Sequence, residues 1–148
     1  MASAAFTHSP ATITAVGAQR VMVAAAEKAA ELQAPSTVAV VDAQGILKAL
    51  LRMDGSPLIG VDLARQKAYT VVAMGGVSTG RLAAGISGNP SVLAALTSLP
   101  DVAVLAGGLP LVLDGVVVGA VGVSAPTGGM DVAVAEAAVD AFSGDAVS

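Results

Sequence analysis

Cysteine and tryptophan are absent from this sequence, and its 148 residues include one histidine, two phenylalanines and one tyrosine. Without cysteine there are no disulfide bonds, thiolate metal sites or cysteine nucleophiles. The lone His8 leaves neither a credible Ser-His-Asp arrangement nor a recognisable spacing of metal ligands. A net charge of −4 and the scarcity of aromatic side chains for base stacking argue against nucleic acid as a partner.

Charged residues are also scarce, at 12% of the chain, whereas hydrophobic residues reach 55% and glycine adds 17 residues. A chain of this length fits one domain. A single domain with so few charges has difficulty covering its surface with polar side chains, and contact between like subunits hides the apolar excess. We therefore expect a homo-oligomer.

One apolar run is long enough to suggest a membrane span, because residues 102–125 carry Asp114 as their one charge. Pro110 and the Asp114-Gly115 pair would break a helix near its middle, and a central aspartate costs about 2.5–3.5 kcal/mol on insertion into a bilayer. Residues 1–10 lack the basic start and long apolar run of a secretory signal. We expect strands in place of a span, no membrane partner and a cytoplasmic location.

Periodicity, capping residues and turn residues divide the chain into helices and strands. Helices are predicted at residues 14–33, 61–74, 78–84, 91–96 and 131–142. Strands are predicted at residues 38–41, 46–51, 102–105, 109–113 and 116–123, the last two joined by an Asp114-Gly115 turn.

Hairpins join most of these five strands, so the sheet should be mainly antiparallel with helices packed on it in layers. The sequence thus predicts an α+β fold of profilin-like type. We expect a single domain over residues 12–143, with a flexible N-terminal arm at residues 1–11 and a flexible tail at residues 144–148.

Short motifs at seven places follow one another in a recognisable order. In the first half they are residues 40–45 (VVDAQG), 52–57 (RMDGSP) and 67–70 (KAYT). In the second half they are residues 107–110 (GGLP), 114–115 (DG), 118–124 (VGAVGVS) and Asp131 at the start of the last helix. In order and approximate spacing the set resembles the GlcG/HbpS family of small haem-binding proteins, which includes the C-terminal domain of PduO-type proteins.

The resemblance implies a five-stranded antiparallel sheet flanked by helices and assembly into dimers and often octamers. For several members of the family it also implies binding of haem or iron. Other members have unknown roles in catabolic gene clusters, and one is a domain attached to a corrinoid adenosyltransferase. The fold by itself therefore does not select an activity.

Three charges stand close together in a chain that has few of them: Arg52, Asp54 and Lys67. As a ligand site, Arg52 would hold a carboxylate such as a haem propionate, Asp54 would orient it or accept a proton, and Lys67 would supply a second cation. As a structural feature, Arg52 would pair with Asp54 or Asp62 to hold the loop, and Lys67 would be a solvated or interface charge. The sequence favours neither interpretation.

Haem iron takes His, Cys, Met or Tyr as an axial ligand, which makes His8 the first candidate for a metal ligand here. Its position in the N-terminal arm favours a solvated residue, with a ligand role across a subunit interface as the alternative. Tyr69 and Met53 are the next candidates, although residues of these types more often serve packing.

Two further features are candidates for ligand contacts. The Gly107-Gly108 pair could present backbone N–H groups to an anion, although a bend between two strands is the simpler interpretation. Ser124 ends a predicted strand and could line a pocket with its hydroxyl group.

These residues support two functions of different classes. The first is a homo-oligomeric protein that binds haem or a similar flat, carboxylated ligand through Arg52, Asp54 and Lys67 beside an apolar pocket. The second is a cofactor-independent isomerase, lyase or hydrolase for a small carbonyl or carboxylate metabolite, with Asp54 as general acid or base and the two cations holding the anion. Beside these two functions stands a third interpretation, an accessory subunit without chemistry of its own.

Overall fold

The computed structural model describes residues 4–145. Its helices are η1 (Ala4–Phe6), α1 (Ala15–Glu31), α2 (Ile59–Ala73), α3 (Thr79–Ile86), α4 (Pro90–Thr97) and α5 (Met130–Asp145). Its strands are β1 (Thr37–Asp42), β2 (Leu47–Arg52), β3 (Gly108–Leu113) and β4 (Val116–Ser124). The predicted arm and tail extend into residues 1–3 and 146–148, which lie outside the described residues.

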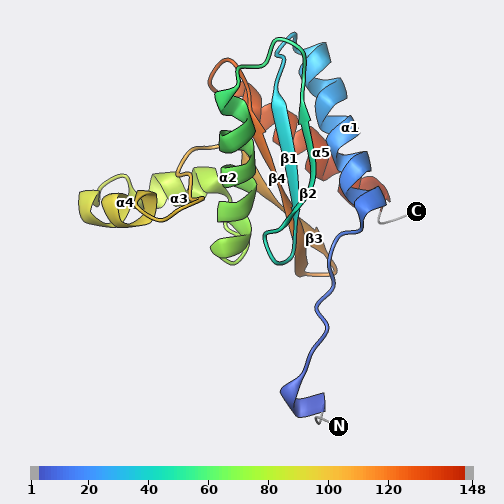
Figure 1. Cartoon of the computed structure of the whole chain (residues 1–148), viewed down its shortest axis with the longest axis vertical. Helices are drawn as coiled ribbons and strands as arrows, with labels where there is room; N and C mark the ends of the chain where they lie inside the picture. Colours follow the sequence, from blue (N-terminus) through green and yellow to red (C-terminus); the bar gives the residue numbers. More distant parts are fainter. Residues whose placement is uncertain (1–3, 146–148) are drawn as a thin grey trace.

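The four strands form one antiparallel sheet in the order β2-β1-β4-β3. Helix α2 packs on one face of the sheet, and helices α1 and α5 pack together on the other, as Figure 1 shows. The predicted α+β fold with an antiparallel sheet between helices is therefore confirmed. Within residues 4–145, no helix combines the length and apolarity needed to cross a membrane.

The prediction of a fifth strand at residues 102–105 is wrong, and the described part of the chain has four strands. This segment returns along α2 and does not join the sheet. Its Ala103 N–H donates to Thr70 Oγ1 at 3.0 Å, and the preceding Asp101 pairs with Arg65 at 2.8 Å. An apolar, β-branched segment is typical of partial burial, and here the segment is buried against helix α2. Its backbone N–H group can then bond to a side chain of that helix and needs no neighbouring strand.

Side chains of different size line the two faces of the sheet. Val38, Val40, Val121 and Val123 belong to the buried cluster formed with α1 and α5. The other face, under α2, carries small residues such as Gly122, where an added Cβ would collide with the Ala64 carbonyl oxygen of α2. The α2 backbone therefore lies directly against the strands, and only glycine fits at this crossing.

The turn between β3 and β4 follows the sequence prediction. Asp114 has φ 50° and Gly115 has φ 76°, so both central residues adopt the left-handed region that a type I′ turn requires. Helices α3 and α4 also form where expected, but they project from the layered body (Figure 1).

Candidate ligand site

Lys67 lies on the face of α2 that meets the sheet, and only 3% of the residue is exposed. Its ammonium donates to the Val123 carbonyl at 2.8 Å and pairs with Asp131 Oδ2 at 3.0 Å. Asp131 stands in the first turn of α5, where a carboxylate is favoured by the helix dipole. One buried cation thus joins α2, β4 and α5.

The Gly107-Gly108 pair passes directly beside this ammonium. Gly107 has φ 115°, and an added Cβ there would lie 2.7 Å from the Val123 carbonyl oxygen and 3.0 Å from Lys67 Nζ. The Gly108 N–H donates to Thr79 Oγ1 at 2.9 Å, so this N–H group is already occupied. Glycine is needed here because any side chain would displace Lys67 or β4.

Arg52 and Ser124 lie at the same end of the sheet, because Thr37 of β1 pairs with both of them. The exposed Arg52 donates from Nη1 to the Ser56 carbonyl at 2.8 Å, which closes the loop at residues 53–57. Asp54 is exposed within that loop. The structure therefore brings Lys67 together with the glycine pair and Asp131, whereas Arg52 is engaged by its own loop.

The three candidate iron ligands lie in different surroundings. His8 is exposed in the segment that precedes α1. Tyr69 is half-buried against the β1–β2 turn, where an added Cβ at Gly45 would lie 3.1 Å from its ring. Met53 packs on the core, and its sulfur accepts from the Ser36 N–H at 3.5 Å. Within residues 4–145, no three His, Cys, Asp or Glu side chains are grouped in a way that could hold a metal ion.

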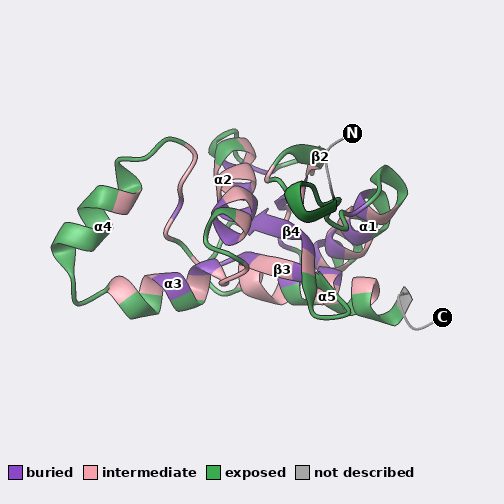
Figure 2. Ribbon diagram, turned by 90° about the horizontal axis from the view of Figure 1, so that it is seen from below, coloured by how far each residue is buried: buried purple, intermediate pink, exposed green. Residues whose placement is uncertain are grey.

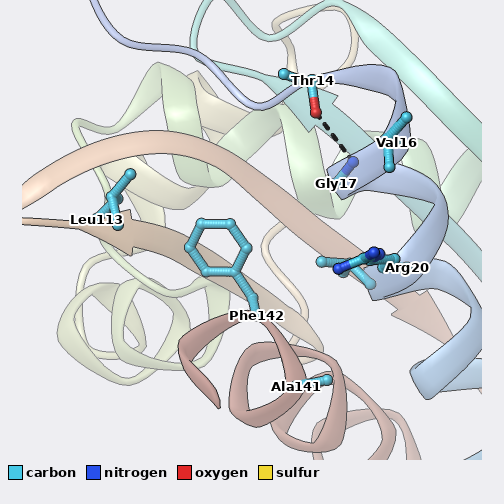
Figure 3. A pocket seen from close by; sticks show the side chains of 8 residues that line it. Thr14, Val16, Gly17, Arg20, Leu113, Ala141 and Phe142 are labelled. Atoms are coloured by element: carbon cyan, nitrogen blue, oxygen red, sulfur yellow. Dashed lines mark hydrogen bonds between the residues drawn. The ribbon is translucent and has the colours of Figure 1, made fainter. Parts of the chain in front are cut away.

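A cavity of about 450 Å³ lies between the start of α1, the end of β3 and the C-terminal part of α5. Its volume falls within the range of about 300–1,000 Å³ usual for small-molecule sites. Figure 3 shows Phe142 and Arg20 facing it from α5 and α1. The lining residues are Thr14, Val16, Gly17, Arg20, Val21, Leu113, Ala141 and Phe142.

The lining is apolar apart from two groups. The Thr14 hydroxyl accepts from the Gly17 N–H at 3.1 Å, which is its role as the N-cap of α1. Arg20 is an exposed residue and is the one charged residue among the eight that line the cavity. A cavity with this lining can bind an apolar ligand that carries a carboxylate. None of the eight lining residues is a His, Cys, Met or Tyr, so none can serve as an axial ligand to haem iron.

Sequence reasoning missed this cavity because its walls come from three segments far apart in the chain. Within the predicted helices at residues 14–33 and 131–142, Arg20 is one polar position among apolar ones, and Phe142 lies on an apolar face. One signal was available: Val16 and Arg20 are four residues apart, which places them on one face of α1. No pattern within α1 shows that β3 and α5 end opposite that face.

Comparison with known proteins identifies relatives along nearly the whole chain. The family described as haem degrading protein HbpS-like matches residues 13–140. An uncharacterised 15.0 kDa protein of Citrobacter freundii is 35% identical over 134 residues, which cover 90% of this chain and 94% of that protein.

Two solved structures extend this comparison. The structure of PduOC in complex with haem is 30% identical and has a TM-score of 0.80, with 88% of this chain and 94% of that chain covered. A double mutant of HbpS from Streptomyces reticuli is also 30% identical, with a TM-score of 0.83 and 95% and 93% of the two chains covered.

Proposed function

This chain belongs to the HbpS-like family, and we propose that it is a homo-oligomeric protein that binds haem or a similar flat, carboxylated ligand. The observation that carries the proposal is the apolar cavity with Arg20 as its single charge. The likeness to a structure solved with haem supports the ligand class. Each subunit is proposed to be one domain over residues 12–143, and the copies are proposed to assemble as a dimer or a larger oligomer of up to eight subunits.

The cavity residues would make two kinds of contact with the ligand. Val16, Leu113 and Phe142 would cover the faces of a flat ring system, and Arg20 would hold a carboxylate at the rim. Bound haem would bring the iron, which needs an axial ligand from outside this lining.

His8 is the proposed source of that ligand. Ile13 anchors the segment before α1 through its N–H bond to the Val118 carbonyl at 2.8 Å, and Thr14 already lines the cavity. The six residues from His8 to Thr14 can span up to about 20 Å when extended. This reach allows His8 to approach the cavity of its own subunit or of a neighbour.

A haem titration followed by absorbance tests this assignment. Arg20→Ala should weaken saturable binding by at least about tenfold, because a charge-assisted hydrogen bond contributes about 1.5–3 kcal/mol. Arg52→Ala is the matched control and should bind as the unaltered protein does. If Arg52→Ala loses affinity and Arg20→Ala does not, the carboxylate lies at the end of the sheet, where the sequence alone placed it. A shift that never saturates would reject the cavity as a haem site.

A cofactor-independent enzyme is the second candidate, and the buried Lys67–Asp131 pair beside Gly107 favours it. A buried ammonium paired with a carboxylate can hold an anion or move a proton, although such pairs also serve structure. In this alternative Asp54 is the general acid or base, and Arg52 and Lys67 hold the anion.

Incubation with a panel of short oxo and hydroxy acids tests the enzyme alternative. Substrate should disappear with the unaltered protein and persist with Asp54→Asn, whose haem titration should be unchanged. If the unaltered protein converts none of the panel, the binding function stands alone.

A further inference from the structure

The side chains able to ligate haem iron lie outside the apolar cavity. The chain has no cysteine, so within residues 4–145 these side chains are His8, Tyr69, Met22, Met53, Met74 and Met130. None of them belongs to the cavity lining. A haem ring in this cavity would therefore find no axial ligand on its walls.

Two of the methionines are engaged through their sulfur atoms. Met53 Sδ accepts a hydrogen bond from the Ser36 N–H at 3.5 Å. Met130 Sδ accepts one from the Thr127 hydroxyl at 3.0 Å, at the start of α5, whereas the cavity lies at the C-terminal part of that helix. Both sulfur atoms thus serve local hydrogen bonds.

The other candidates differ in how far they can move. Met22 packs against the buried core cluster, Tyr69 packs against the β1–β2 turn, and Met74 follows the last turn of α2. His8 belongs to a segment, residues 4–12, that is exposed at every position (Figure 2). Among the described residues His8 is therefore the candidate that can approach a ligand in the cavity, and it would do so from outside.

The cavity walls offer an apolar surface and one positive charge in place of a metal ligand. Leu113 and Phe142 provide apolar contact, and burial of apolar surface is favourable whatever atom occupies the centre of the ring. The Arg20 guanidinium can pair with a carboxylate through charge-assisted hydrogen bonds. Neither contact involves a metal ion.

The cavity continues along α1 into a shallower depression of about 360 Å³. Val16 and Arg20 line both hollows, so Arg20 stands where the two meet. Glu27 lines the depression about two helical turns beyond Arg20, and its negative charge disfavours a second carboxylate there. The two hollows together therefore hold one carboxylate, at Arg20, and leave any other in water.

We infer that the cavity selects its ligand by a flat apolar body and a single carboxylate, and that it binds a metal-free ring acid through the same contacts as haem. The inference rests on the proposed function and names the ligand class of that site, in which haem is one member. An iron–His8 bond would add affinity for haem, but the cavity itself does not require it.

A fluorescence titration with iron-free protoporphyrin tests the inference, because the metal-free ring fluoresces whereas haem iron quenches this emission. Binding should saturate at one ring per cavity. Its Kd should lie within about threefold of the Kd of haem for His8→Ala, since neither complex then has the axial bond. Arg20→Ala should weaken binding of the metal-free ring by at least about tenfold, and Arg20→Lys should restore part of it. Arg52→Ala is the matched control and should bind as the unaltered protein does.

Esters of the same ring test how many carboxylates the protein holds. The monomethyl ester should bind as tightly as the free diacid, because Arg20 pairs with one carboxylate, whereas the dimethyl ester should bind at least about tenfold more weakly. Ala141→Phe narrows the cavity and should weaken haem and the metal-free ring alike.

The outcomes separate this inference from the proposed function. A protein that binds haem saturably but not the metal-free ring would overturn the inference and leave haem binding intact. A protein that binds neither ring would overturn both. Unchanged binding of the metal-free ring by Arg20→Ala and Ala141→Phe would show that this ring binds elsewhere, which also overturns the inference.

Discussion

Helices α2 and α4 show two ways in which one chain orders a helix. Six residues of α2 are buried, including Ala64, Lys67 and Val71, and its backbone lies against glycines of the sheet. No residue of α4 is buried, and α4 has instead a clear N-cap and a proline in its first turn. Packing thus dominates the stability of α2, whereas α4 depends on its capping residues and on its connection to α3. Substitutions near α2 should therefore change the free energy of unfolding strongly, whereas substitutions in α4 should mainly change local order.

The largest effect is expected at the α2–β4 crossing. Gly122→Ala should lower the free energy of unfolding by about 3 kcal/mol or more, because the new Cβ meets the Ala64 carbonyl and the backbone must move. Urea unfolding measures this change. Gly85→Ala in α3 is the control, because an added Cβ there meets nothing within 4 Å. It should raise stability by about 0.5–1 kcal/mol, as alanine does in place of glycine within a helix. Equal losses for the two variants would contradict the comparison.

An intermediate effect is expected from the buried ion pair that holds α2 to α5. Lys67→Met should destabilise the protein by about 2 kcal/mol, less than the ~3–5 kcal/mol of a fully buried pair. The loss is smaller because the Asp131 side chain retains 16% exposure, so that water reaches the unpaired carboxylate.

A second variant separates charge from packing in that pair. Lys67→Met with Asp131→Leu should recover much of the loss in the same urea experiment, because no unpaired charge remains. If the double variant were less stable than Lys67→Met, the hydrogen bonds of the pair would stabilise the fold in a way that apolar side chains do not replace.

The smallest effect on stability is expected at the helix N-caps, and it should differ between α1 and α4. Thr14→Ala removes the N-cap of α1 and should lower global stability by about 1 kcal/mol, since α1 is part of the core. Asn89→Ala removes the N-cap of α4 and should leave global stability unchanged while the amides of α4 exchange faster with solvent. Thermal unfolding and hydrogen exchange measure the two quantities. Equal shifts in unfolding temperature would mean that α4 is as integral to the fold as α1.

The sequence by itself determined helices α1 to α5, the four strands of the sheet, the position of the β3–β4 turn and the family. These features depend on neighbours in the chain: a helical or alternating pattern, a capping side chain, an Asp-Gly pair between two apolar runs. The order of the seven motifs can be read directly from the sequence, so the resemblance to the GlcG/HbpS family needed no coordinates. The comparisons and the structure confirm the family and the α+β fold. The roles of Arg52, Asp54 and Lys67 stay predictions.

Only the tertiary structure decided what residues 102–105 do, where Lys67 finds its partners and where the cavity lies. An apolar run records that a segment is partly buried, but not whether a strand or the Thr70 hydroxyl satisfies its backbone. Lys67 and Asp131 are 64 residues apart, and the ends of α1, β3 and α5 that form the cavity meet only after the sheet has assembled. Contacts between distant segments follow from packing geometry, which no local spacing of residues encodes.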